Sequence, residues 1–389
     1  MKIIKVLIIL LFISILQSYS QTPKVQVGAE ATKEYLPLLK DKRIAIMSNN
    51  TGMVGNQHVV DLLVQNKVNV VAIFSPEHGF RGNADAGEHV SSSVDEKTGI
   101  AIRSLYDGDA GKPSKESMGL FDIMIIDVQD VGLRFYTYYI TMTKLMDACA
   151  EYNKKMIILD RPNPNGHYVD GPILDMKHKS GVGWLPIPVV HGMTLGELAL
   201  MINGEKWLPE ARVCDVTVIK CKNYTHKTLY QLPIAPSPNL PNMKSIYLYP
   251  STCLFEATPV SLGRGTSFPF QVYGHPNMKE YTFSFTPRSI EGAKNPPQLN
   301  RLCYGVDLRN VSDEEIFKNG FDLSYVIDAY KNLNLDDHFF RPFFEKLVGV
   351  DYIRKMIIEG KSAQEIKEMW QGDVAKFKKQ RAPYLLYEE

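Results

Sequence analysis

The sequence predicts an α/β protein, with a Rossmann-like parallel-sheet N-terminal domain and a second, smaller α/β domain. Two observations predict this class. Short apolar segments of strand length alternate with helical segments as far as about residue 220, a pattern typical of a parallel sheet covered by helices on both faces. From about residue 230 the chain becomes rich in proline and glycine, which indicates a change of architecture. We therefore expect one domain at residues 22–240 and another at residues 241–389.

The spacing of apolar residues and the end signals place the elements of the first domain. Strands are expected at residues 43–52, 69–79, 101–108, 121–132, 155–166 and 213–221. Helices are expected at residues 28–42, 58–66, 136–153 and 194–204. The last helix should begin with a capping box, in which Thr194 and Glu197 each accept the other's backbone N–H. In the second domain we expect short strands between glycine turns, then helices at residues 321–333, 343–360 and 362–387.

Residues 1–20 have the pattern of a secretory signal peptide. Two lysines precede an apolar run from Val6 to Leu16, and the small residues Ser18 and Ser20 fit a cleavage site. The alternative is an uncleaved membrane anchor, but the apolar run is short for a helix that spans a bilayer. We expect the protein to be exported, to the periplasm or beyond, with no membrane association after cleavage.

Charge and motif content exclude several classes of function. The formal net charge is +1, and no run of like charges indicates a nucleic-acid-binding surface. Neither G-x-G-x-x-G nor a phosphate loop occurs at a strand–helix turn, so no nucleotide cofactor is expected. The five cysteines form no C-x-x-C pair, and their odd number leaves at least one thiol unpaired in the monomer.

Polar residues follow four of the expected strands. In an open parallel sheet, ligands bind beyond the carboxyl ends of the strands. The loops at residues 48–51, 75–79, 127–134 and 160–166 all belong to that edge, and all carry hydrogen-bonding side chains. Any one of them could cap the following helix, but four together predict a polar ligand pocket. Asn49 and Asn163 are the ligand-binding candidates from the first and last loops.

Glu77 is the sharpest catalytic candidate. It follows a buried strand, and burial raises the pKa of a carboxyl group, so that the group can hold the proton that a general acid needs. The alternative is a Glu paired with Arg81 or capping a turn. His78 could orient Glu77, bind ligand or pack in the structure.

The loop at residues 127–134 supplies two further acids, Asp127 and Asp130, and a cation, Arg134. Tyr136 follows, and aromatic faces stack on sugar rings, although most rings here are expected to belong to the core face of a helix. Other binding candidates, each weak alone, are Asn239 on a stiff proline-rich loop, Glu256, Arg264 between two glycines, and His191.

Metal and nucleophilic chemistry are less favoured. Four histidines flank the same edge, but neither H-x-H nor H-E-x-x-H spacing occurs, so no metal is expected. No G-x-S-x-G motif indicates a nucleophilic serine.

Seven longer motifs allow a family comparison. They resemble the exo-β-N-acetylmuramidase family, the NamZ-type glycoside hydrolases, once classed as a domain of unknown function, from about residue 24 to the C-terminus. The motifs are "SPEHGFRG", "DVQDVGLRFYTY", "DRPNPNG", "HGMTLGE", "PSPNLPN", "CLFEATPVSLGRGT" and "FKKQRAPYLLY".

The resemblance implies an active site between two domains and removal of N-acetylmuramic acid from the non-reducing end of peptidoglycan fragments, with no cofactor or metal. The acid of "PEHG" is Glu77, assigned here as acid/base catalyst, and the acids of "DVQDVG" are Asp127 and Asp130. One departure is Ala257, where glycine is expected in many relatives.

This activity fits the residues. N-acetylmuramic acid carries a lactyl carboxylate, which needs a cation, and Arg134 or Arg264 is favoured over Arg81. Asp127, Asp130 or the substrate's own acetamido group would stabilise the oxocarbenium-like centre. The competing hypotheses are a non-catalytic protein that binds wall fragments and a metal-dependent wall amidase or esterase.

Overall fold

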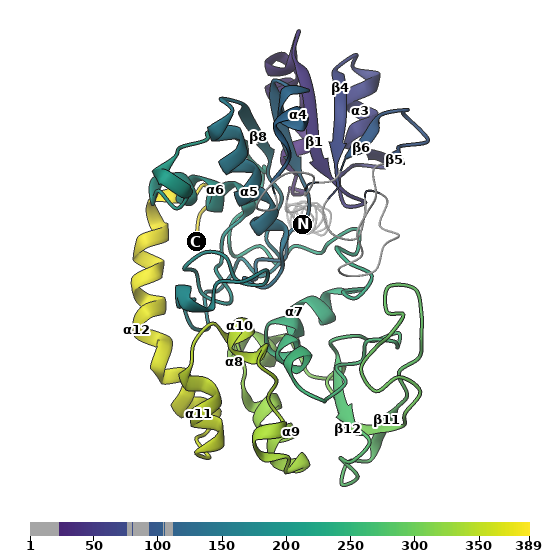
Figure 1. The fold of residues 1–389 in the computed structure, drawn as a ribbon, viewed down its shortest axis with the longest axis vertical. Coiled ribbons are helices and arrows are strands. Elements are labelled where there is room, and N and C mark those ends of the chain that lie inside the picture. Colours follow the sequence, from purple (N-terminus) through teal and green to yellow (C-terminus); the bar gives the residue numbers. More distant parts are fainter. Residues whose placement is uncertain (1–22, 76–79, 81–92, 104, 106–111) are drawn as a thin grey trace, which may run out of the picture.

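The computed structural model describes residues 23–75, 80, 93–103, 105 and 112–389. A layered α/β unit lies above a smaller unit in Figure 1, and a long C-terminal helix runs down one side of both. In the described ranges no helix is long and apolar enough to cross a membrane.

A mostly parallel sheet forms the centre of the first unit, as predicted. Within the described residues its order is β5-β6-β4-β1-β7-β8-β9, and only the short edge strand β5 is antiparallel to its neighbour. The strands are β1 (Arg43–Ser48), β4 (Asn69–Phe74), β5 (Ser93–Val94), β6 (Ala101–Arg103), β7 (Ile123–Asp127), β8 (Lys155–Leu159) and β9 (Asp215–Ile219). A separate hairpin pairs β2 (Met53–Val54) with β3 (Gln57–His58).

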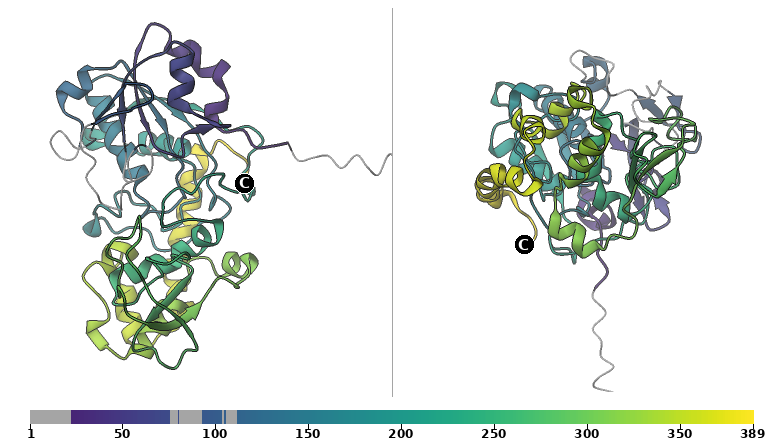
Figure 2. Two further views of the ribbon diagram at one scale, coloured as in Figure 1. Left: turned by 90° about the vertical axis from the view of Figure 1, so that its right-hand side faces the viewer. Right: turned by 90° about the horizontal axis from the view of Figure 1, so that it is seen from below.

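Helices cover both faces of this sheet (Figures 1 and 2). Along β1, Ile44 and Ile46 belong to one buried cluster and Ala45 and Met47 to another, because successive side chains of a strand point to opposite faces. The covering helices are α3 (Val59–Gln65) on the first face, and α4 (Lys115–Gly119), α5 (Tyr138–Glu151) and α6 (Leu195–Gly204) on the second.

The predicted capping box of α6 is confirmed. Thr194 Oγ1 accepts the backbone N–H of Glu197 at 3.2 Å, and Glu197 Oε2 accepts that of Thr194 at 2.9 Å. The helix predicted at residues 28–42 instead forms three short pieces. Ala31, with φ −81° and ψ 50°, separates the first two, and Pro37, which has no N–H to donate, lies at the start of the third. These pieces are η1 (Gly28–Glu30), α2 (Thr32–Tyr35) and η2 (Leu36–Leu39).

The second unit has a small antiparallel sheet and a group of short helices. The sheet order is β10-β12-β11, with β10 (Val272–His275), β11 (Phe283–Phe285) and β12 (Cys303–Asp307). The helices are α7 (Met243–Thr252), η6 (Cys253–Ala257), α8 (Asp313–Asn319), α9 (Ser324–Leu333), α10 (Phe344–Val348) and α11 (Tyr352–Ile358). The region of α7 and η6, where short strands were expected, is therefore helical.

Helix α12 (Ala363–Arg381) and the residues after it attach to the first unit. Asp170, from a loop of that unit, accepts Trp370 Nε1 and Lys367 Nζ, both at 2.8 Å. Beyond the helix, Tyr387 donates to Asp160 Oδ2 at 2.7 Å, and the backbone N–H of Leu386 donates to Glu197 Oε1 at 2.8 Å. The end of the predicted second domain thus completes the first.

We expect Asp170→Asn to lower the free energy of unfolding by about 2–3 kcal/mol, because it removes the charge that pairs with Lys367 and holds α12. The matched control is Asp373→Asn on the same helix, whose exposed carboxylate pairs with Lys376 and should contribute about 0.5 kcal/mol or less. Urea unfolding measures both. Equal losses in the two variants would contradict the role given to Asp170.

Candidate active site

The loops after β1, β7 and β8 meet at one edge of the sheet. Thr51 Oγ1 accepts the backbone N–H of Gln129 at 2.9 Å. Gln129 Nε2 donates to the carbonyl of Pro162 at 2.7 Å, and Asn165 Nδ2 donates to that of Val131 at 2.9 Å. Three of the four predicted loops therefore form a continuous polar rim.

The fourth loop carries the predicted residues Glu77, His78 and Arg81, which lie outside the described residues. Their roles stay predictions. The structure places the strand before them: β4 ends at Phe74, in register with Met47 of the neighbouring β1.

Asp127 is not available to a substrate. Its two carboxylate oxygens accept Arg161 Nε at 2.6 Å and Arg161 Nη2 at 3.0 Å, and both side chains are buried. The same Nη2 donates to the carbonyl of Met53 at 3.1 Å. The expectation that Asp127 takes part in catalysis disagrees with this geometry, because a carboxylate sealed in a two-bond ion pair holds the rim together and cannot reach a sugar.

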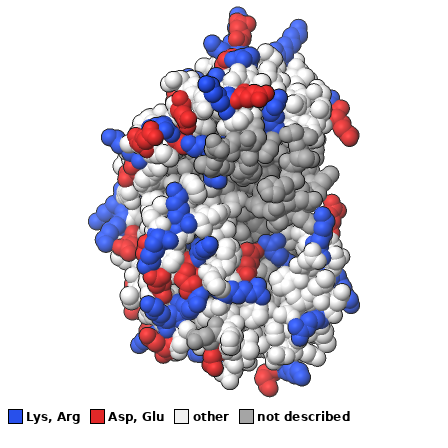
Figure 3. Space-filling view, viewed as in Figure 1, with Lys and Arg blue, Asp and Glu red and all other residues white. Residues whose placement is uncertain are grey.

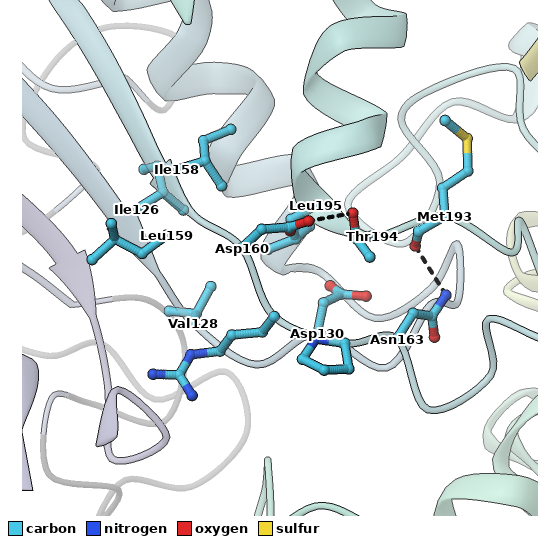
Figure 4. A pocket seen from close by; sticks show the side chains of 12 residues that line it. Ile126, Val128, Asp130, Ile158, Leu159, Asp160, Asn163, Met193, Thr194 and Leu195 are labelled. Carbon is cyan, nitrogen blue, oxygen red and sulfur yellow. Dashed lines mark hydrogen bonds between the residues drawn. The ribbon is translucent and has the colours of Figure 1, made fainter. Parts of the chain in front are cut away.

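Asp130 is also enclosed. Its Oδ1 accepts the backbone N–H of Gly132 at 2.7 Å, and its buried Oδ2 has no hydrogen-bond partner in the described chain. Burial raises the pKa of Asp130 to about 7, against the two backbone N–H groups that act to lower it. Figure 4 shows its carboxyl group near Asp160, Thr194 and Asn163. The cavity they line, about 10 Å³, holds about one water molecule and excludes a sugar ring.

Three predicted ligand-binding residues instead support the rim. Asn49 Nδ2 donates to Tyr138 Oη at 2.8 Å, and Asn163 Nδ2 donates to the carbonyl of Met193 at 2.9 Å. His191 accepts the backbone N–H of Met193 through Nδ1 at 3.3 Å. Burial lowers the pKa of His191 to about 3, so the ring is neutral. All three predicted side chains are buried, and their contacts give no support for ligand binding.

Arg134 is fully buried and bound to the backbone. Its Nη1 donates to the carbonyls of Pro172 at 2.6 Å and Ile187 at 3.0 Å, and its Nη2 to those of Leu347 at 2.9 Å and Val348 at 2.8 Å. Burial lowers the pKa of Arg134 to about 10, so the group is still charged at neutral pH. The prediction that Arg134 binds the lactyl carboxylate is therefore wrong on geometry, because four carbonyls already surround the guanidinium.

An open pocket of about 150 Å³ lies between the two units. Four of the predicted binding residues line it: Tyr136, Asn239, Glu256 and Arg264. Sequence reasoning did not single out its other walls, because aromatic residues there also fit a core. These walls include Phe135, Tyr138, Ser237, Tyr249 and Phe270.

The polar end of the pocket is an ion pair between Arg264 and Glu256, with Arg264 Nη2 2.5 Å from Glu256 Oε1. Burial acts to lower the pKa of Arg264, but Glu256 outweighs this effect and raises it. The residues on either side, Gly263 and Gly265, have φ of 86° and 82°, a conformation that side chains other than glycine rarely adopt.

The rest of the pocket is aromatic. The centre of the Arg264 guanidinium lies 5.2 Å from the ring centroid of Phe270, and Tyr249 packs edge-on against Phe270 with 4.7 Å between ring centroids. Tyr136 donates its hydroxyl to the carbonyl of Pro236 at 2.9 Å. Burial raises the pKa of Tyr136 and of Tyr249, so both phenols stay neutral. Rings beside a cation suit a small anionic sugar.

Neither the drawn surface nor the described side chains show a concentrated charge or a metal-binding group. On the face drawn in Figure 3, basic and acidic side chains are interspersed over both units, and neither sign forms a continuous field. Within the part of the chain that the structure describes, no group of three or more His, Cys, Asp or Glu residues is placed to hold a metal ion.

Comparison with known proteins identifies the family. Residues 44–244 match the family model described as exo-β-N-acetylmuramidase NamZ, N-terminal, and residues 247–387 match the corresponding C-terminal model. The chain belongs to the NamZ family. One NamZ relative, the peptidoglycan β-N-acetylmuramidase NamZ of Bacillus subtilis (strain 168), is 38% identical over 95% of this chain and 92% of its own length.

Two crystal structures of DUF1343 family proteins from Bacteroides fragilis NCTC 9343 share the fold of this NamZ family chain. One is 70% identical with a TM-score of 0.89, and the other is 28% identical with a TM-score of 0.79. Each match covers 94% of this chain and 99% of the other.

The enclosed carboxyl of Asp130 predicts a pH-dependent stability. Its pKa is about 7 in the folded chain, against an ordinary value of 3.8, so the folded state binds the extra proton between about pH 4 and pH 7. The stability gained from the protonated group is complete below about pH 4 and is lost as the pH rises through 7. Asp130→Asn keeps the acceptor for Gly132 and cannot ionise. We expect it to match the parent at pH 4 and to exceed it by roughly 4 kcal/mol at pH 8. Urea unfolding across this range measures the difference, and a difference that does not change with pH would contradict the assignment.

Proposed function

We propose that this chain is an exo-acting β-N-acetylmuramidase, which hydrolyses the bond to non-reducing terminal N-acetylmuramic acid in peptidoglycan fragments. The observation that carries the proposal is the match along almost the whole chain to a relative named as a peptidoglycan β-N-acetylmuramidase. The pocket between the units supports it, because it joins aromatic walls to a cation in a space that suits one small sugar.

Recognition of the lactyl carboxylate falls to Arg264 in this proposal. Among the described residues that line the pocket, Arg264 is the cation, whereas Arg134 is enclosed by carbonyls. A guanidinium in a partly buried site forms strong charge-assisted bonds to a carboxylate. N-acetylglucosamine has no lactyl carboxylate, so Arg264 would discriminate between the two sugars.

The proposed chemistry uses Glu77 as general acid on the leaving oxygen. Asp127 and Asp130 are both enclosed, so of the three stabilising groups considered we favour the substrate's own acetamido oxygen, which attacks the anomeric carbon as the glycosidic bond breaks. Water then hydrolyses the cyclic intermediate, and Glu77 takes the proton back. Replacing the N-acetyl group by N-trifluoroacetyl should slow turnover, and an unchanged rate would exclude this route.

Export is part of the proposal. The lysines and apolar run before Ser18 support a signal peptide, and a wall-derived substrate lies outside the cytoplasm. The mass of the protein recovered from the producing cells tests it: cleavage after Ser20 gives a chain that begins at Gln21, and an intact Met1 end would contradict it.

Protein lacking residues 1–20 should release a chromogenic aglycone from a β-N-acetylmuramide but not from the matching glucosaminide. Glu77→Gln should fold normally and lose about 10²–10⁴-fold in kcat, because it cannot donate the proton. The matched control is Glu116→Gln on the exposed face of α4, which should keep full activity. Near-parental turnover by Glu77→Gln would remove Glu77 from the mechanism.

Arg264→Met should raise the KM for the muramide by roughly 10- to 100-fold, the equivalent of about 1.5–3 kcal/mol for a charge-assisted contact. Arg43→Met is the control, because Arg43 is also ion-paired but lies far from the pocket. Competition of free N-acetylmuramic acid with the chromogenic muramide gives the same comparison without turnover of the competitor. An unchanged KM would move carboxylate recognition elsewhere.

A further inference from the structure

The Glu256–Arg264 ion pair occupies the position where an acidic sugar would be recognised. Both side chains are about three-quarters buried, with 26% and 22% of their surface exposed, and both line the pocket between the units. In the described chain, the carboxylate of Glu256 accepts its one hydrogen bond from Arg264. The pocket therefore already contains a carboxylate bound to its own cation.

The nitrogen that Glu256 contacts decides what else Arg264 can bind. A guanidinium grips a carboxylate with two parallel bonds, either through Nε and Nη2 or through Nη1 and Nη2. Within the described residues the first edge is used three times, for Asp122 on Arg43, for Asp127 on Arg161 and for Asp307 on Arg309. Nη2 belongs to both edges. Each edge uses one of the two N–H groups of Nη2, so a second carboxylate on Arg264 would lie beside Glu256, and the two like charges would compete for the same cation.

Arg264 is held more firmly than Glu256. The left-handed glycines on both sides fix its backbone, and a Cβ on Gly265 would lie 2.5 Å from the carbonyl oxygen of Arg288. Thr266 closes the turn by donating its hydroxyl to the carbonyl of Gly263 at 2.6 Å. The Arg264 guanidinium also lies 5.2 Å from the ring centroid of Phe270, whereas Glu256, on the short helix η6, has its one hydrogen bond in the described chain from Arg264. A competing carboxylate would therefore displace Glu256 and leave Arg264 in place.

We propose that Glu256 is a specificity-determining residue that acts as an internal counter-ion, held on Arg264 until the carboxylate of an acidic sugar replaces it. This inference rests on the proposed function. A sugar without a carboxylate leaves the ion pair closed. An acidic sugar exchanges one carboxylate for another, and Glu256 returns to Arg264 as the product leaves, so that the charge of Arg264 is never left unpaired beside aromatic walls.

The test is the affinity for free sugars, measured by calorimetry on the protein lacking residues 1–20. Glu256→Gln removes the competing charge, so N-acetylmuramic acid should bind about tenfold more tightly, the equivalent of one charge-assisted bond. The affinity for N-acetylglucosamine should not change. Glu359→Gln, exposed at the end of α11, is the matched control and should change neither affinity. Glu256→Ala provides a second variant with the same expected direction, and thermal unfolding checks that each is folded.

The background Arg264→Met shows whether Glu256 acts through Arg264. Adding Glu256→Gln to it should leave the dissociation constant for N-acetylmuramic acid unchanged, because there is no cation to release. Weaker binding of N-acetylmuramic acid to Glu256→Gln, or a loss of kcat with no change in affinity, would overturn the proposal. A parent protein that binds the sugar but never hydrolyses a muramide would refute the proposed function instead, and the calorimetric comparison would still decide the role of Glu256.

Discussion

The arrangement of the two units depends on the burial of one guanidinium. Arg134 donates to two carbonyls of the first unit and to two carbonyls of α10 in the second. Separating the units would strip two of these bonds from a charge that has no water around it, at a cost of several kcal/mol. The pocket has walls from both units, so the contact that Arg134 makes between them helps to hold those walls in place from a buried position.

The cost of burying a charge also separates the roles of the acidic residues. Asp127 is buried together with the cation Arg161 and is part of the scaffold. Asp130 is buried without one, and burial raises its pKa. The carboxylate exposed to the pocket comes from the second unit, at Glu256. Scaffold and binding surface thus use the same residue types, and solvent access distinguishes them.

The fold could be predicted from the sequence wherever residues a few positions apart determine the local structure. The buried run of β7 and the capping box of α6 depend on residues within a few positions, and the structure has both as expected. Helix α7 was missed because Tyr247 and Tyr249 favour strands, although Asn242 caps it. In the site, the long motifs located Arg264 and Glu256. They failed for Arg134, whose four partners lie 38 to 214 positions away, since no local pattern records such contacts.

The final residues have a consequence for how the chain reaches its native state. Tyr387 bonds to Asp160 and Leu386 to Glu197, two buried acids of the first unit, and a ribosome delivers these partners 227 and 189 residues after the acids. Until those residues have been synthesised, each of the two acids lacks one of its hydrogen-bond donors. The first unit is therefore complete only after the second has been synthesised, so the two units do not fold strictly one after the other.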